Sequence, residues 1–363
     1  MARPPAKTKT PRKPAARPAR HDFDSPQIDL FRRFLCNGED ERDRLSNTLD
    51  LWDSVPRFAM SRQAMAKLRT GKGFLDLLKL DFSYRGTQLK AIIQPARIEQ
   101  ADGTSLDYYP SASEELVEDA LRKIAAERRH GYFGQSEPGS GVSFTLYMLR
   151  EELGKRGHTR SYQQIMLSLN ILARSTIEIR TSDGASAGAF AISNYLSSLA
   201  SVSREGWLDD PQAKWVAQFH PLVTESIDAL TYRQFNYHQM MAHSTQLARW
   251  LHKQLSLKFT FASVATTFEM RYSTVKRDSG LLSGYSRERK AIEALDAAFA
   301  ELQASGVLMH AQRNDILGPR GKLEDVAYTL TASLNFVAEA KAANKRHQLA
   351  VQARISVDKN VDK

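Results

Sequence analysis

Residues 142–181 read VSFTLYMLREELGKRGHTRSYQQIMLSLNILARSTIEIRT, and their apolar residues predict two helices followed by a strand. Leu146, Leu149 and Leu153 lie three and four residues apart, which is the spacing of one face of a helix. Gly154 is typical of a helix end, because glycine accepts the left-handed backbone found there. A short basic turn then separates this helix from the next one.

The second helix of this stretch begins after the turn. Thr159 is a suitable N-cap, because its hydroxyl can accept a hydrogen bond from a free backbone N–H of the first turn. Ile165, Leu169 and Leu172 form the apolar face. The period then changes to two, and an Asp-Gly pair predicts a hairpin turn. Helix, turn, helix and hairpin in this order are typical of a winged helix.

The flanking sequence extends this pattern into two domains. Ser111–Glu114 form a capping-box pattern that starts a further helix, so the first domain is predicted to span residues 111–235. Residues 236–338 repeat the order of elements without repeating the letters. We therefore predict an α+β protein with two tandem winged-helix domains.

The remaining segments are predicted to lie outside these domains. Residues 1–26 combine basic residues with prolines and cannot bury a core, so we expect a disordered basic tail. This tail either follows DNA phosphates or stays solvated. Residues 27–110 are predicted to be an N-terminal extension, and residues 339–363 a polar C-terminal tail that does not pack.

The composition is that of a folded, basic protein. Of 363 residues, 42% are hydrophobic and 25% are charged, and the formal net charge is +10 at pH 7. This charge favours DNA, RNA or an anionic membrane surface as partner, although a basic enzyme can have the same charge. The single cysteine, Cys36, excludes an intrachain disulfide and a cysteine-based zinc site.

Several classes of protein do not fit the sequence. We see no apolar stretch of membrane-spanning length and no secretory signal, so we expect a bacterial cytoplasmic protein without a membrane partner. No phosphate-binding loop, H-E-x-x-H or G-x-S-x-G motif occurs. The nine histidines include no H-x-H pair of the kind used by metal-dependent nickases. We predict no catalytic residue, no metal ligand and no cofactor.

The candidate DNA-binding residues follow from the helix-turn-helix pattern. Its second helix enters the major groove by its N-terminal turns, where arginine pairs with guanine and glutamine with adenine. Cations in the turns and in the wing suit phosphates, although exposed helix ends without any ligand are also often polar. The predicted DNA-binding residues are Lys155, Arg156, Arg160, Ser161, Tyr162, Gln163 and Gln164 in the first domain, and Arg271, Tyr272, Lys276, Arg277, Arg287, Arg289, Lys290, Arg320 and Lys322 in the second.

The order of elements resembles that of plasmid replication initiators of the TrfA and RepA type. Residues 142–149 and 159–172 resemble their first winged helix, and residues 230–255 resemble the linker and first helix of the second. The resemblance covers roughly residues 112–335. It implies a protein that binds directly repeated origin sites called iterons, helps to open the adjacent duplex and recruits the host helicase. Some members form dimers, so a homodimer stays open for this chain.

A short motif upstream agrees with this resemblance. Gln27, Ile28, Asp29, Leu30 and Phe31 match the pentapeptide Q-L-x-L-F, by which many bacterial proteins bind the replicative sliding clamp. In an extended peptide, the Leu-Phe pair would fill an apolar pocket while the glutamine forms hydrogen bonds at its edge. Initiators similar to TrfA carry such a motif upstream of their winged helices. The alternative is the start of an amphipathic helix.

Two other functions fit parts of the pattern. A tandem winged-helix transcriptional repressor would bind a promoter operator, usually palindromic, and would not bind the clamp. An origin nickase would cleave one strand through a metal and a tyrosine, which the missing histidine pair disfavours. We predict the initiator, with double-stranded origin DNA, the sliding clamp and the host helicase as partners.

Overall fold

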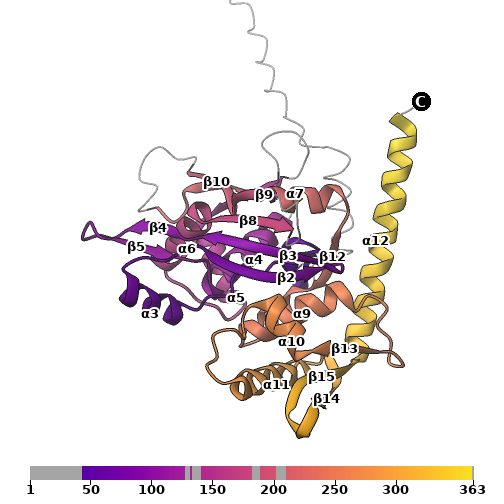
Figure 1. The fold of residues 1–363 in the computed structure, drawn as a ribbon. Helices are drawn as coiled ribbons and strands as arrows, with labels where there is room; N and C mark the ends of the chain where they lie inside the picture. The colour runs from indigo at the N-terminus through magenta and orange to yellow at the C-terminus, as the bar shows by residue number, and fades with distance from the viewer. Residues whose placement is uncertain (1–42, 127–130, 133–139, 182–188, 202–209, 362–363) are drawn as a thin grey trace, which may run out of the picture.

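The computed structural model describes residues 43–126, 131–132, 140–181, 189–201 and 210–361. The described chain forms two α+β parts that lie against each other (Figure 1). One hydrophobic core is built from residues between Leu49 and Met241, and a second from residues between Leu247 and Val337. The basic tail and residues 27–31 lie outside the described residues. The α+β class and the two tandem winged helices predicted from the sequence are confirmed.

The second domain has the element order of a winged helix. Its elements are α9 (Gln246–Lys258), β13 (Thr267–Arg271), α10 (Tyr272–Ser279), α11 (Glu288–Ala304), β14 (Leu308–Leu317) and β15 (Leu323–Ala332). The three strands form an antiparallel sheet in the order β13-β15-β14. Helices α10 and α11 are the helix-turn-helix, and α11 packs its apolar stripe of Ile292, Leu295, Phe299 and Leu302 into the core. The β14–β15 hairpin is the wing.

The first domain contains the same order with a different sheet. Its elements are α4 (Ala112–Ala126), β7 (Gly141–Thr145), α5 (Leu146–Lys155), α6 (Tyr162–Arg174), β8 (Thr176–Thr181) and β9 (Ala189–Asn194). Strand β7 does not join the β8–β9 hairpin; it pairs with β11 (Lys214–Phe219), which pairs in turn with β10 (Leu196–Ser201). The hairpin therefore needs another partner for its free edge.

Residues upstream of position 111 supply that partner. Strands β2 (Leu78–Tyr84) and β3 (Thr87–Gln94) form a hairpin, and β3 pairs with β8 in a sheet of order β2-β3-β8-β9. Leu89, Ala91 and Ile93 on β3 are fully or almost fully buried. Strand β1 (Leu45–Leu49) also pairs with β12 (Tyr232–Asn236). The described part of the predicted extension 27–110 is thus built into the first domain, because its alternating apolar residues complete that core.

The remaining elements complete the first domain. They are η1 (Trp52–Ser54), α3 (Arg62–Lys72), β4 (Ala96–Glu99), β5 (Ser105–Tyr108), β6 (Gly131–Tyr132), α7 (Pro221–Asp228) and α8 (Tyr237–Met241). Strands β4 and β5 form a two-stranded hairpin, and β4 packs against α6. This hairpin and α3 lie at the left edge of the molecule in Figure 1.

The C-terminal region differs from the polar, unpacked tail predicted for residues 339–363. Residues from Leu334 to Val361 form one helix, α12, which runs from the second domain along β12 of the first (Figure 1). Ala343 and Ala350 are buried. Asn236 donates a hydrogen bond to Glu339 at 2.7 Å, and Asn344 donates to the carbonyl of Thr260 at 2.7 Å. Small residues seven positions apart let this helix approach the body closely, so a polar composition did not prevent packing.

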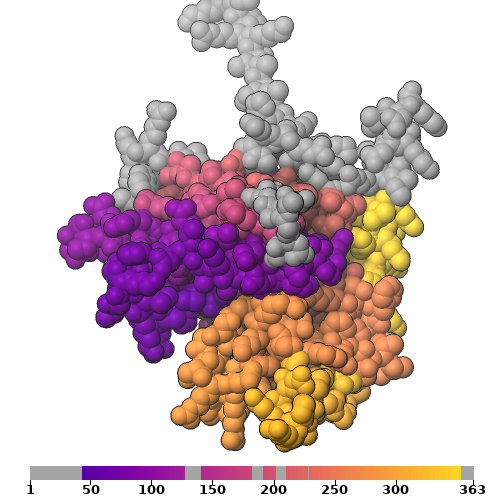
Figure 2. Space-filling model, viewed as in Figure 1, coloured from indigo at the N-terminus to yellow at the C-terminus, as the bar shows by residue number. Residues whose placement is uncertain are grey.

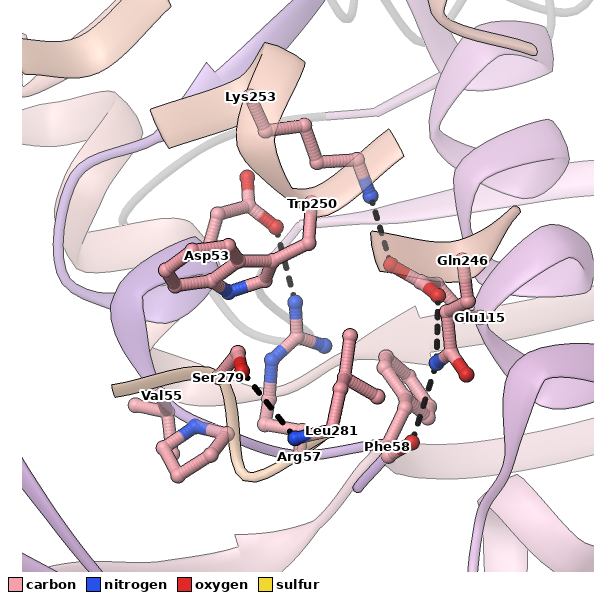
Figure 3. Close-up of a pocket in the computed structure, with 11 residues that line it drawn as sticks. Asp53, Val55, Arg57, Phe58, Glu115, Gln246, Trp250, Lys253, Ser279 and Leu281 are labelled. Carbon is pink, nitrogen blue, oxygen red and sulfur yellow. Dashed lines mark hydrogen bonds and ion pairs between the residues drawn. The ribbon is translucent and has the colours of Figure 1, made fainter. Parts of the chain in front are cut away.

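Buried charges join the two domains. The ammonium of Lys253 on α9 lies 2.6 Å from Asp119 of α4. It also lies 3.4 Å from Glu115 of the same helix (Figure 3). All three side chains are less than 10% exposed. Removing one partner of such a pair lowers the free energy of unfolding by roughly 3–5 kcal/mol, because the other charge stays buried without compensation. The domains are therefore held in one orientation.

A second set of ion pairs is centred on Asp53. Asp53 of η1 accepts hydrogen bonds from Arg57 at 2.8 Å and from Arg122 at 2.9 and 3.0 Å. Burial alone would raise the pKa of Asp53, but the charges of Arg122, Lys253 and Arg57 together hold it well below its usual range. The backbone carbonyl of Asp53 also accepts a hydrogen bond from Gln254 of α9 at 2.9 Å. The same loop therefore contacts α4 and the second domain.

Close backbone approach adds to this interface. Gly280, which ends α10, has φ +67°, and a Cβ at this position would lie 2.7 Å from the Cβ of Ala59. Asp278 accepts a hydrogen bond from the backbone of Ser83 at 3.0 Å. Only a glycine fits both the left-handed backbone and this contact. No helix in the described part of the chain is long and apolar enough to cross a membrane.

Two buried histidines near this interface are held neutral. The ring of His220 stacks on Trp52 with centroids 4.4 Å apart, and its Nδ1 accepts a hydrogen bond from the backbone of Leu222. His252 on α9 shares a hydrogen bond of 3.0 Å with His243. Burial, with nearby positive charge, lowers the pKa of both His220 and His252 to about 3.

Stability should therefore fall in mild acid. Between pH 3 and 6.5 the unfolded chain binds protons at these histidines while the folded chain does not, so the stabilisation is complete above pH 6.5 and is lost as the pH decreases. Going from pH 7.5 to 5.0 should cost about 2 kcal/mol for each histidine. Urea unfolding of His220→Gln and His252→Gln should show a smaller pH dependence than the wild type, and the exposed His310→Gln should not. Identical pH dependence in all four proteins would contradict this assignment.

Candidate nucleic-acid interface

Helix α6 begins with a capping box. The hydroxyl of Ser161 accepts a hydrogen bond from the backbone N–H of Gln164 at 3.2 Å, and the Oε1 of Gln164 accepts one from the backbone N–H of Ser161 at 2.9 Å. Ser161, and not the predicted Thr159, is therefore the N-cap. The box uses the oxygen that Gln164 would need for bidentate pairing with adenine, so that prediction conflicts with the local hydrogen bonding. Gln163, next to it, is exposed, and the capping box uses neither its amide oxygen nor its amide NH2 group.

Arg156 is part of the fold, and its prediction as a phosphate contact is wrong. Its side chain is 2% exposed. The guanidinium lies 2.8 Å from Asp43 and 2.9 Å from Glu152, and it also contacts His238 at 2.8 Å. These partners hold the guanidinium inside the domain, because a buried arginine must keep its hydrogen bonds satisfied. A basic residue in the turn thus ties α5 to α8.

Two other predicted residues of the first domain, Lys155 and Tyr162, differ in exposure. Lys155 is exposed and lies 3.7 Å from Glu151, a pair of little energetic weight at the surface. Tyr162 is half-buried, and the guanidinium of Arg150 lies 4.8 Å from its ring centroid. Arg150 is exposed and was not predicted from the sequence, because nothing in its neighbours marks it as different from a solvated helix residue.

A pocket opens beside the start of α6. It has a volume of about 290 Å³ and includes Arg160 and Gln164 on the α6 side, and Arg62 and Tyr108 from α3 and β5. Leu116, Val117, Leu153 and Leu167 are also in its lining. Two arginines line this pocket and no acidic residue does. Its two arginines and Gln164 therefore lie beside the start of α6.

The start of α11 presents exposed cations. The side chain of Arg289 is 90% exposed and lies 3.1 Å from Glu293, and Lys290 lies 2.6 Å from the same carboxylate. Arg287 is exposed and precedes the first helical residue. Exposed pairs contribute about 0–1 kcal/mol, so a phosphate or a base edge can replace Glu293 as partner. This end of α11 corresponds to the predicted arrangement.

The predicted DNA-binding residues in and beside α10 differ in their exposure to solvent. Tyr272 is 3% exposed and belongs to the core of the second domain, so its prediction as a DNA-contacting residue is wrong. Its apolar ring is better buried than solvated at the start of this helix. Arg271, Lys276 and Arg277 are exposed or half-buried. They lie near Glu269 at 3.3 Å, Glu288 at 3.6 Å and Asp278 at 2.7 Å.

The wing turn presents two exposed cations. Arg320 has φ +66° in the turn between β14 and β15, and Lys322 follows it. On the wing strand, Arg313 lies 2.9 Å from Asp296 of α11 and 2.7 Å from Asp315. Arg313 was not among the residues predicted from the sequence to bind DNA. Its ion pair with Asp296 connects the wing to α11. No cluster of three or more possible metal-ligating residues occurs among the described residues.

Comparisons with known proteins return structures only. No protein-family model matches the chain, and no curated protein is similar to it in sequence. A structure of domains 2 and 3 of RctB is 13% identical, with a TM-score of 0.46, over 72% of this chain and 92% of that chain. Another structure of RctB domains 2–3 is 13% identical, with a TM-score of 0.42, over 74% and 95%. The Pi initiator protein in complex with iteron DNA is 12% identical, with a TM-score of 0.40, over 67% and 98%.

Replacing the partly exposed Arg160 and the exposed Arg289 should separate base reading from structural roles. If Arg160 and Arg289 each contact a base edge, their replacement by alanine should weaken specific binding by about 1–3 kcal/mol relative to a scrambled duplex. Fluorescence anisotropy with a duplex selected from random sequence would measure both affinities. Arg156→Ala serves as contrast, since it should lower the thermal unfolding temperature. An unchanged ratio of specific to scrambled affinity in both surface variants would refute the base-reading role.

Proposed function

We propose that this chain is a plasmid replication initiator that binds repeated origin DNA sites. The observation that carries the proposal is the pair of helices α6 and α11, each the second helix of a helix-turn-helix, in two domains joined by the buried contacts of Lys253. Exposed cations at the start of α11 and polar side chains at the start of α6 suit a major groove. The resemblance carried by residues 142–172 and 230–255 agrees with this function.

In the proposed mechanism, both helices enter successive major grooves on one face of the duplex. The β14–β15 wing and the cations of α10 contact phosphates and set the register. Because the domains are held in one orientation, the duplex must adapt to the protein. When several copies bind adjacent repeats, the deformations that they impose on the duplex would add to one another. The cost of such deformation depends on the DNA sequence, and the strain would favour opening of a neighbouring AT-rich segment.

A DNase footprint on the sequence that flanks the gene tests this function. We expect protection of several direct repeats, weakened by roughly 10³- to 10⁵-fold between 50 and 200 mM salt if six to ten phosphates are neutralised. Inserting half a helical turn inside one repeat should abolish its protection, because α6 and α11 cannot move apart. A single palindromic site at the promoter would instead favour a transcriptional repressor. Equal protection of every sequence would contradict both functions.

Recruitment of the sliding clamp belongs to the same proposal and rests on the sequence of residues 27–31. Leu30→Ala/Phe31→Ala should abolish capture of the purified clamp and leave the footprint unchanged, because these residues lie upstream of both winged helices. Asp29→Ala, at the variable position of the motif, is the matched control. Undiminished capture by the double variant would exclude this motif. Recruitment of the host helicase and a homodimer are parts of the proposal that the same purified protein can test.

A further inference from the structure

Helix α3 is a basic helix that the sequence patterns did not single out. Its eleven residues include Arg62, Lys67, Arg69 and Lys72 and no acidic residue. Met65 is its one buried residue. Ser61 caps its start and Gly73, with φ +77°, ends it. Because the helix buries only one residue, apolar packing contributes little to its position, and its cations need other partners.

Two of the four cations hold the helix in place. Arg62 lies 2.6 Å from the buried carboxylate of Glu114 on α4, and Arg69 donates a hydrogen bond to the carbonyl of Asp107 at 2.9 Å. Both guanidinium groups lie 4.8 Å from the ring centroid of Tyr108 on β5. These contacts fix α3 against α4 and β5, so its remaining charges have a defined position.

The two lysines point to a partner outside the chain. Lys67 is exposed and makes no ion pair with any residue in the described ranges. Lys72 pairs with Asp76, but both side chains are 55% exposed, so water or a phosphate can replace that contact at little cost. Figure 2 shows the edge of the molecule that contains α3 protruding beyond the body. A lysine is a compact charge on a flexible stem and suits a phosphate without reading a base.

Helix α3 adjoins the proposed DNA-reading helix of the first domain through Arg62, at the start of α3. The pocket beside the start of α6 is shared between the two, since Arg62 and Tyr108 line it together with Arg160 and Gln164. If the start of α6 enters a major groove, the strands that border the groove pass on either side of that helix end. The phosphate backbone is therefore the polyanion nearest to α3.

We propose that α3 binds the DNA phosphate backbone beside the major groove that α6 enters. This rests on the proposed function. Lys67 and Lys72 supply the charge, while Arg62 and Arg69 position the helix. The contact adds affinity and fixes the register of the duplex on the first domain, and it carries no base specificity.

The salt dependence of binding tests this surface. The dissociation constants of the full-length wild type and of Lys67→Ala/Lys72→Ala would be measured on an origin repeat and on a scrambled duplex between 50 and 300 mM potassium chloride. We expect the slope of log K against log salt to decrease in magnitude by about 1.8, and each lost contact to weaken binding about eightfold at 0.1 M salt. Both duplexes should be affected equally. Lys67→Arg/Lys72→Arg should restore the wild-type slope.

The matched control is Lys341→Ala/Lys345→Ala, which removes two exposed lysines of α12 on the opposite side of the molecule (Figure 1). It should leave the slope unchanged, and thermal unfolding should be the same in all variants. A wild-type slope in the α3 variant overturns the proposal, as does a loss confined to the origin repeat. A loss of binding to anionic phospholipid vesicles with unchanged DNA affinity overturns it too. If the wild type does not prefer the origin repeat, the proposed function fails, and the change of slope on scrambled duplex still decides the role of α3.

Discussion

The pairing of Lys253 with Asp119 and Glu115 is the constraint on which the arrangement of the molecule depends. Charges that leave water must find partners in one particular geometry, because an uncompensated buried charge costs several kcal/mol. The lysine belongs to α9 of the second domain and the carboxylates belong to α4 of the first domain. Apolar packing alone would allow the domains to slide, whereas these ion pairs select one orientation.

That orientation sets the spacing between α6 of the first winged helix and α11 of the second. The close approach of Gly280 to Ala59 and the hydrogen bond from Gln254 to the carbonyl of Asp53 stabilise the same domain orientation as the ion pairs. Helix α12 crosses from the second domain to β12 of the first and adds a further connection. A duplex that contacts both α6 and α11 would therefore meet them at a spacing set inside the protein.

Burial divides residues of one chemical type into different roles. Arg156 and Arg57 are buried with acidic partners and hold the fold, whereas Arg289 is 90% exposed and free to change partners. Tyr272 looks suitable for a DNA surface in the sequence, yet it completes a core. A count of cations near a predicted helix start therefore overestimates the interface. It also misses α3, whose cations form a surface only because Tyr108 and Glu114 position the helix.

The sequence by itself determined the elements whose physics is local. The apolar spacing of residues 146–172, the wing turn at residues 318–321 and the cations at the start of α11 follow from helix period, turn chemistry and capping, all of which act over a few residues. The tertiary structure alone decided the pairing of β3 with β8, the packing of α12, the burial of Arg156 and the orientation of the domains. These depend on contacts between residues far apart in the chain, and a strand edge or a buried charge finds its partner only when the whole core has formed.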